Sequence, residues 1–457
     1  MERQKISVIF PYFMKGLSKS EQRWFAIMRI ITRCVIYDER MKGKSGGGYI
    51  MSDKICSSAD KVLEVFLENA PMDTSHHRMV KQQNKCGYGL QGVCCRLCSN
   101  GPCRLSPAKP KGVCGADADT IACRNFLRQV AAGSGCYTHI VENTARRLKE
   151  MAQELQAEGK KPKYKDSVAK LAKILQINCC GNCGPDCHNS CAKTAEMIAD
   201  AVLADIRKPY DEKMTLMKNI ALPKRYELWE KLGILPGGAK DEIFNAVVKT
   251  STNLNSDPMD MLLQCLRLGI STGNYGLILT NLMNDIIMGP PQISMDPVGF
   301  RIIDPEYINI MITGHQQSMF ADLEEKLESE IVQKSAELVG AKGIRIVGCT
   351  CVGQDYQARS GCYKDVYCGH AGNNYTSEAV LMTGCVDLVV SEFNCTIPGI
   401  EPICEQLDIK MICLDDVAKK ANAQLLPYTA EEKEKITSQI IADALCGFKN
   451  RKEKLYG

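Results

Sequence analysis

The sequence has little histidine and few aromatic residues: six histidines and two tryptophans in 457 residues, with Phe, Trp and Tyr together at 6%. Six histidines are too few for a histidine-rich metal store. No run of 18 or more apolar residues is present, so the sequence predicts no membrane span. The first residues mix charged side chains with short apolar runs, which does not resemble a secretory signal. We therefore expect a soluble, cytoplasmic protein.

The excess of one sign of charge over the other is also small. The net charge is +4, of which residues 1–50 carry +6 (ten Lys or Arg against four Asp or Glu), leaving −2 for the remainder. A nucleic-acid-binding surface needs a clustered basic face, so the sequence predicts no nucleic-acid partner. With 45% hydrophobic residues, the length allows two to three domains with their own cores and excludes general disorder.

Cysteine, in contrast, is abundant, with 25 residues. This is several times ordinary usage, yet below that of short secreted disulfide scaffolds. In a reducing compartment, clustered thiols indicate metal ligands before disulfides.

The chain divides into three parts by pattern. Residues 1–50 are basic and irregular and end in a glycine run, which suggests an atypical extension with Met51 as the true start; a genuine basic arm is the alternative. Residues 51–290 have mainly helical periodicity, with helices expected at 139–159, 192–206, 223–234, 240–252 and 258–270. Residues 291–457 alternate strand-like runs (308–315, 344–351, 386–395, 410–416) with helical ones such as 321–343. This βαβ order predicts a Rossmann-like, doubly wound parallel sheet, and hence an α + α/β fold.

The first cysteine group lies in NKCGYGLQGVCCRLCSNGPCRLSPAKPKGVCG. Cys95, Cys98, Cys103 and Cys114 have the spacing C-x2-C-x4-C-x10-C, with glycines that let backbone amides approach a cluster. Four such thiolates suit a [4Fe-4S] cluster, and tetrahedral zinc is the simpler alternative.

Two further cysteines, Cys86 and Cys94, are too few to complete a cluster. They are either lone thiols or half of a ligand set on a twofold axis, where a second subunit supplies the rest; the latter predicts a homodimer. A later group, Cys179, Cys180, Cys183, Cys187 and Cys191, allows an additional cluster as a hypothesis.

In the α/β part, His315, Cys351 and Cys395 each follow a predicted strand. The carboxyl ends of parallel strands open onto one crevice, so these three residues can converge on a shared metal site. Each taken alone is more typical of packing or hydrogen bonding.

From about Met51 onward, the segments TSHHRMVKQQNKCGYGLQGVCCRLCSNGPCRL, GVCGADADTIACRNFLRQVAAG, INIMITGH, GCTCVGQD and VDLVVSEFNCTIPGI closely resemble the anaerobic nickel-iron carbon monoxide dehydrogenases. The resemblance implies oxidation of CO with water to CO2, two electrons and two protons, with electrons leaving through [4Fe-4S] clusters to a ferredoxin-like acceptor.

The resemblance also implies a role for each cysteine motif. Cys86 and Cys94 would bind a cluster shared between two subunits, and Cys95, Cys98, Cys103 and Cys114 a neighbouring relay cluster. His315 and Cys351 would bind the outlying iron of a nickel-iron-sulfur cluster, and Cys395 its cubane.

The pattern departs from the family in two places. The family has a third α/β domain with three more cysteine ligands, whereas this chain stops at Gly457 and has only Cys446, within a helical pattern, beyond Cys413. We therefore expect an incomplete ligand set, with three protein ligands and one side open to water, which disfavours assembly of the cluster and leaves the activity of this chain an open question. The family also commonly has histidines at three-residue spacing along a helix, where they help protons leave the site. In this sequence only His139 of that set is present. Alternative functions are a non-catalytic iron-sulfur electron-transfer remnant and a hydroxylamine-reductase-like hybrid-cluster enzyme.

Overall fold

The computed structural model describes residues 61–178, 188–293, 295–359 and 366–456, all of which belong to one compact unit, residues 55–457. The predictions for residues 1–50 and for Cys179, Cys180, Cys183 and Cys187 lie outside the described residues. Within the described ranges, no helix has the length and apolar content needed to cross a bilayer.

The cysteine-rich segment folds into short elements. These are α3 (Lys61–Glu68), α4 (Ser75–Lys81), α5 (Gly87–Leu90) and an antiparallel pair of two-residue strands, β1 (Cys94–Cys95) and β2 (Cys103–Arg104). The α4 helix is fastened to the α/β part, because the backbone N–H of Ser75 donates to Glu378 Oε2 over 2.6 Å and Arg78 forms an ion pair with the same buried carboxylate.

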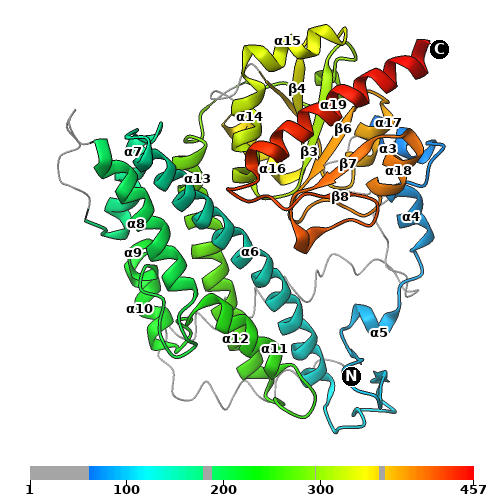
Figure 1. Cartoon of the computed structure of the whole chain (residues 1–457). Coiled ribbons are helices and arrows are strands. Elements are labelled where there is room, and N and C mark those ends of the chain that lie inside the picture. The colour runs from blue at the N-terminus through cyan, green and yellow to red at the C-terminus, as the bar shows by residue number, and fades with distance from the viewer. Residues whose placement is uncertain (1–60, 179–187, 294, 360–365, 457) are drawn as a thin grey trace. The chain divides into compact units, whose positions relative to one another are not determined.

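The helical part is organised around α6 (Ala118–Ala157), a helix of 40 residues that begins at an Asp117 cap, whose side chain accepts the N–H of Thr120. Its apolar positions pack against α8, α11, α12 and α13 (Figure 1). The other helices here are α7 (Lys165–Leu175), α8 (His188–Ile206), α9 (Met217–Ile220), α10 (Pro223–Lys231), α11 (Ala239–Lys249), α12 (Pro258–Ser271), the π-helix η3 (Thr272–Leu279) and α13 (Thr280–Ile287).

The α/β part contains a six-stranded parallel sheet in the order β5-β4-β3-β6-β7-β8. Its strands are β3 (Ile308–Thr313), β4 (Ile344–Cys349), β5 (Tyr367–Gly372), β6 (Leu388–Ser391), β7 (Lys410–Cys413) and β8 (Gln424–Leu425). After β3, the chain adds β4 and β5 on one side of it and then β6, β7 and β8 on the other side, so the strand order reverses at β3. The predicted doubly wound parallel sheet is thereby confirmed, and the reversal opens a crevice at the carboxyl end of β3.

Helices cover both faces of this sheet. Alternate residues of β3 serve the two cores: Ile308, Ile310 and Ile312 pack with α14 (Ala321–Leu327), α16 (Thr350–Ala358) and α19 (Lys433–Tyr456), whereas Met311 packs with α17 (Ser377–Met382) and α18 (Ile400–Leu407). Figure 1 shows α19, in red, crossing one face of the strands. Because alternate residues of a strand face opposite sides of the sheet and helices cover both sides, every residue of β3 is buried.

Three elements differ from the sequence-based expectation. The single helix expected over 321–343 is two helices, α14 and α15 (Glu330–Leu338), because the Ser329 side chain caps the second one by accepting the N–H of Val332. The helix expected from residue 139 already begins at Ala118. Strand β5 was not expected at all, since its glycines and polar residues (YCGHAG) obscure the strand pattern.

Candidate metal centre

His315, Cys351 and Cys395 come together at the carboxyl end of the sheet. Their donor atoms all lie within 4.8 Å of one another, with Cys395 Sγ 3.3 Å from Cys351 Sγ and 3.7 Å from His315 Nδ1. Each follows a different parallel strand, β3, β4 or β6, which explains how residues 80 positions apart can meet. One imidazole and two thiols, each partly buried, form a donor set suited to iron, nickel or zinc.

The hydroxyl groups of three threonines beside these donors lie within hydrogen-bond distance of one another and connect the strand ends. Thr313 Oγ1 lies 3.3 Å from Thr350 Oγ1 and 3.2 Å from Thr396 Oγ1. Thr350 precedes Cys351 and Thr396 follows Cys395, so the hydroxyl network fixes the backbone beside both thiols. All three threonines are buried, so their hydroxyl groups form hydrogen bonds with one another in place of water.

The backbone at this edge is strained. Thr350 has a φ of 58°, Asn394 of 62° and Cys395 of 49°, all in the left-handed region that non-glycine residues rarely adopt. Each such residue costs on the order of 1–3 kcal/mol and persists where the surroundings over-determine it, as happens at functional sites. The strained backbone therefore supports a functional site, in which the positions of the donor atoms rather than local stability determine the backbone conformation.

Glu392 organises the loop that carries His315. Its side chain is fully buried and accepts the backbone N–H of Gln316 over 2.7 Å as well as those of His315 and Phe393. Burial raises the pKa of this carboxyl well above its ordinary value, while the three amides oppose the rise. Gly314, with a φ of 140°, leaves the space that the carboxylate occupies.

The two thiols of the site differ in their protonation. The Cys395 thiol donates to Cys351 Sγ, and this hydrogen bond, together with one from His315, lowers the pKa of Cys351. The same contact and burial raise the pKa of Cys395. The contact therefore favours ionisation of Cys351 over that of Cys395, and a thiolate is the form in which cysteine binds a metal.

Helix α6 forms one wall of the site. The Tyr137 ring meets the His315 ring edge-on at 5.3 Å between centroids, and the His139 ring lies 4.5 Å from that of Phe393. Tyr137 can approach because Gly276 of η3 has no side chain; a Cβ there would lie 2.6 Å from Tyr137 Cβ. The helical part thus contributes aromatic cover to a site built on strand ends.

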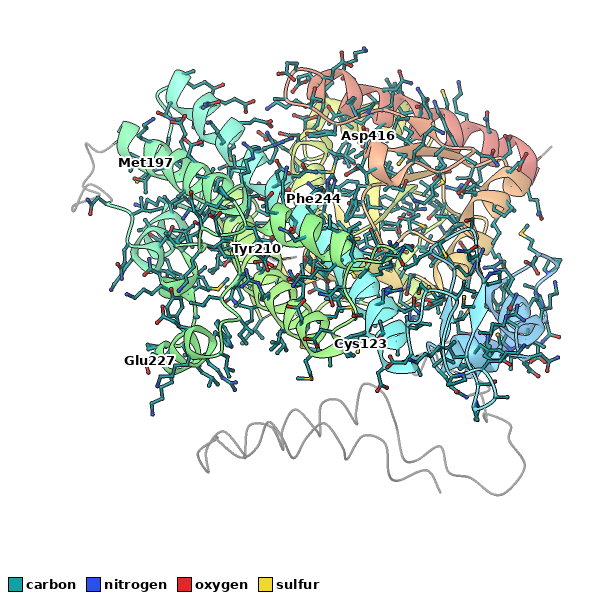
Figure 2. All side chains as sticks on the ribbon, turned by 90° about the horizontal axis from the view of Figure 1, so that it is seen from below. Cys123, Met197, Tyr210, Glu227, Phe244 and Asp416 are labelled. Carbon is teal, nitrogen blue, oxygen red and sulfur yellow. The ribbon has the colours of Figure 1, made fainter. Side chains whose placement is uncertain are left out.

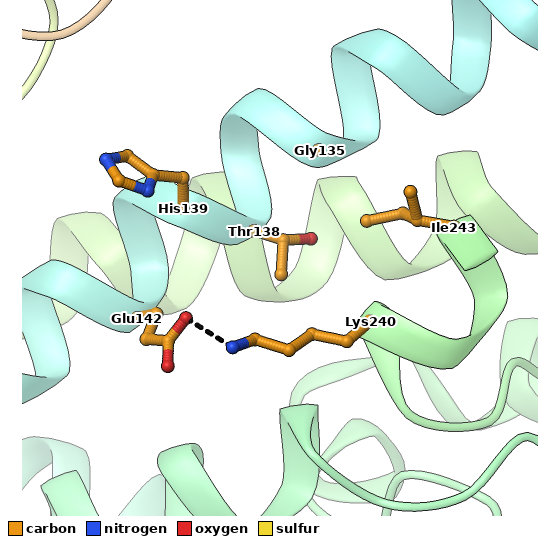
Figure 3. A pocket seen from close by; sticks show the side chains of 6 residues that line it. All are labelled: Gly135, Thr138, His139, Glu142, Lys240 and Ile243. Carbon is orange, nitrogen blue, oxygen red and sulfur yellow. Dashed lines mark ion pairs between the residues drawn. The ribbon is translucent and has the colours of Figure 1, made fainter. Parts of the chain in front are cut away.

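His139 also pairs with a buried acid. Its Nε2 lies 2.7 Å from Asp415 Oδ2, whose side chain is 4% exposed, and 3.0 Å from Asn143 Nδ2. On the solvent side it borders a cavity of about 280 Å³ lined also by Gly135, Thr138, Glu142, Lys240 and Ile243 (Figure 3). His139 therefore stands between this cavity and Phe393, two residues from Cys395.

A second histidine, His370, has one ring nitrogen without a hydrogen-bond partner. His370 of β5 has a buried Nδ1 atom with no partner, and a Cβ on Gly353 would lie 2.7 Å from it. Burial lowers the pKa of His370.

The four predicted relay-cluster cysteines occupy one compact region. Cys95 and Cys103 are paired across β1 and β2, and Gly101 packs against the backbone of Cys95, Cys98 and Cys103. Gly112, two residues before Cys114, adjoins Cys103, since a Cβ there would lie 3.6 Å from Cys103 Sγ. The glycine positions expected from the sequence therefore surround the thiols.

The spacing of these thiols bears on the metal. Four thiolates on one zinc at about 2.3 Å would lie about 3.8 Å apart. In the described ranges, only the His315 group has three or more donors within 4.8 Å. No three thiols of the Cys95 group therefore lie within 4.8 Å of one another. Of the other cysteines that the sequence indicates as ligands, Cys86 is exposed, Cys94 is partly buried and Cys191 is buried. Backbone N–H groups of Gly89 and Tyr88 lower the pKa of the Cys86 thiol.

Sequence reasoning did not find Thr350, Glu392, Tyr137 or the buried Arg124 beside Cys95. Only the positions of Thr350 and Glu392, next to strand ends, could have drawn attention to them.

This combination of a cysteine-rich segment, a long helical part and a doubly wound sheet with a His-Cys-Cys edge defines a known class. Residues 93–456 match the model of the Prismane/CO dehydrogenase family, and the chain belongs to that family.

Among its relatives, a carbon monoxide dehydrogenase of Methanopyrus kandleri is 44% identical over 405 residues, covering 88% of this chain and 61% of the relative. One of Methanocaldococcus jannaschii is 42% identical over 402 residues, covering 87% and 63%. The nickel-free crystal structure of carbon monoxide dehydrogenase from Thermococcus sp. AM4 superposes with a TM-score of 0.79 at 29% identity, covering 89% of this chain and 63% of that one. Carbon monoxide dehydrogenase IV from Carboxydothermus hydrogenoformans gives 0.77 at 29%, covering 86% and 60%. The chain thus spans about three fifths of the length of these relatives.

Proposed function

We propose that this chain is the cluster-binding part of a cytoplasmic carbon monoxide dehydrogenase. The reaction is CO + H2O to CO2 with two electrons and two protons, and the electrons pass through [4Fe-4S] clusters to a ferredoxin-like acceptor. The observation that carries the proposal is the convergence of His315, Cys351 and Cys395 at one strand-end crevice, in a chain of this family.

The ligand roles follow the family pattern at the matching positions. His315 and Cys351 would hold the outlying iron of a nickel-iron-sulfur cluster and Cys395 its cubane, while Cys95, Cys98, Cys103 and Cys114 would hold the relay cluster. Cys86 and Cys94 would meet the same pair of a second subunit in a homodimer; the exposure of Cys86 is consistent with this. When bound, the nickel-iron-sulfur cluster supplies the binding of CO and water and accepts the electrons.

The remaining residues of the site have supporting roles. Tyr137 covers the imidazole of His315 and excludes water from one side. Glu392 holds the backbone of the His315 loop, so that the imidazole is presented in one orientation. His139, paired with Asp415, can hold at Nε2 a proton released at the site and pass it to the adjoining cavity.

The test is anaerobic production of the full chain with iron and nickel, followed by metal analysis and CO-dependent reduction of viologen dye. We expect iron at the Cys95 group, and any nickel that binds should depend on the His315 group. Replacing Cys351 and Cys395 together with alanine should remove the nickel and any dye reduction, and should leave the iron of the Cys95 group in place. Cys446→Ala, an exposed cysteine on α19, is the matched control.

The outcomes separate the candidate functions. Iron without nickel or CO oxidation would favour an electron-transfer remnant. Dye oxidation with hydroxylamine instead of dye reduction with CO would favour a hybrid-cluster reductase.

A further inference from the structure

Arg124, on the face of α6 that meets the cysteine-rich segment, is a buried cation with no acid beside it. The residue is 3% exposed, and its side-chain contacts within the described ranges are with a thiol and a backbone carbonyl rather than with a carboxylate. Nη1 lies 4.0 Å from Cys95 Sγ, and Nη2 donates to the backbone carbonyl of Asn255 over 3.3 Å. Nε is buried and has no partner. Figure 2 labels the preceding residue, Cys123, on the same helix.

The other buried arginines are paired differently. Of the four in the described ranges, Arg359 pairs with Asp285 at 2.9 Å, Arg451 with Asp387 at 2.7 Å, and Arg147 with Asp322. Only Arg124 lacks a carboxylate. A buried charge without a counter-charge costs several kcal/mol, and such charges are normally paired or neutralised. The arrangement around Arg124 therefore lacks an anion.

Neighbouring acids do not supply it. The Asp117 carboxylate caps α6 by accepting the N–H of Thr120, and Asp260, next to the Asn255 segment, pairs with Lys249. On the other side Arg124 faces Cys95, which is buried in an apolar cluster with Leu105 and Ile121. The counter-charge must therefore lie on the side of the thiols.

We propose that Arg124 is the buried counter-charge of the [4Fe-4S] cluster bound by Cys95, Cys98, Cys103 and Cys114, and that it raises the reduction potential of this cluster. The inference rests on the proposed function, because it requires a cluster at this position. Four thiolates give the bound cluster a negative charge, and reduction adds one electron without a proton. A fixed cation in apolar surroundings favours the more negative, reduced form.

The experiment compares variants of the full chain loaded with iron and sulfide. Arg124→Gln removes the charge, Arg124→Lys keeps it, and Arg146→Gln removes a charge from the same helix, where it is half exposed and pairs with Glu142. Each protein is titrated with dithionite at measured potentials and followed by electron paramagnetic resonance. The relevant signal is the one that Cys98→Ala abolishes.

We expect Arg124→Gln to lower the ratio of reduced to oxidised cluster at least tenfold at a fixed potential, which for one electron corresponds to about 59 mV. Arg124→Lys should change the ratio less than threefold, and Arg146→Gln should not change it. An unchanged ratio in Arg124→Gln, with the cluster present, overturns the inference.

Loss of the cluster is also decisive. If Arg124→Gln loses iron while Arg124→Lys keeps it, the requirement for a positive charge is supported. If both lose iron, the charge is not the property that matters, and the inference fails. A wild-type chain that binds no iron at Cys95, Cys98, Cys103 and Cys114 instead contradicts the proposed function, so the two failures are distinguishable.

Discussion

The Glu392 carboxylate occupies the space that a side chain on residue 314 would need, and Gly314 leaves that space free. Gly314 has a φ of 140°, and a Cβ atom on it would overlap the Glu392 carboxylate. That carboxylate accepts the backbone amides of the loop carrying His315. The position of one predicted metal ligand thus depends on a residue that has no side chain.

Gly314→Ala is expected to displace Glu392 and the His315 loop. The steric overlap and the unfavourable φ together should lower the free energy of unfolding by about 2–4 kcal/mol and abolish nickel binding. Thermal unfolding and metal analysis check this. Gly133→Ala, on α6 with no atoms within 4 Å of the added methyl, should be neutral or stabilising by about 0.5–1 kcal/mol. Equal effects of the two variants would contradict the expectation.

Glu392→Gln tests the carboxylate itself. An amide has one oxygen in place of two and adds a donor that faces three backbone N–H groups, so the loop should lose its fixed orientation. Residues that orient metal ligands typically contribute 10–100-fold in affinity, and a loss of that size is expected for nickel or zinc at the His315 group. Metal competition titrations measure it, with the exposed Glu405→Gln as the control. Affinity within twofold of the wild type would count against the role of Glu392.

Thr350 links the backbone of two strand ends. Its hydroxyl accepts the N–H of Gly314 over 2.8 Å and donates to the carbonyl of the same residue over 2.9 Å. Thr350→Val keeps the shape but leaves the N–H of Gly314 without its acceptor, whereas the Gly314 carbonyl still accepts the N–H of Val352 over 3.1 Å. The variant should lower the free energy of unfolding by about 1–3 kcal/mol. Thr350→Ser retains the hydroxyl and should cost less than about 1 kcal/mol. Denaturant unfolding distinguishes them, and a Ser variant as unstable as the Val variant would show that packing dominates.

Glu142 should make stability depend on acid pH. Burial works to raise its pKa, but Lys240 and Arg207 outweigh burial and lower it to about 2, below the ordinary value of about 4.3 (Figure 3). Because the folded state favours the ionised form, the contribution is complete above about pH 5 and is lost as the pH falls towards 2.

Glu142→Gln should therefore cost about 1–2 kcal/mol at pH 7, reduced by the solvent exposure of the cations, and about half as much at pH 3. Unfolding measured at both pH values checks this prediction. A penalty that is the same at pH 3 and pH 7 would contradict it.

Much of this architecture could be predicted from local pattern. The alternation of Ile308, Ile310 and Ile312 marks β3, and the placement of His315 after that strand indicated where it would meet Cys351 and Cys395. The supporting residues could not be found in this way. Glu392 and Thr350 act through contacts with residues 76 and 36 positions away, respectively, and Arg124 is distinguished only by the acid it lacks. Such information arises from tertiary packing and has no periodic signature.

Helix α6 carries Arg124 near one end of the proposed electron path and His139 beside the other. The two residues are 15 positions apart, which corresponds to about 22 Å along the axis, at about 100° of rotation per residue. A single inserted or deleted residue would turn one group away from its partner while leaving the other in place. Exposed positions of this stretch should therefore tolerate substitutions, whereas a change in its length should not be tolerated, because the helix sets both the distance and the relative rotation of the two groups.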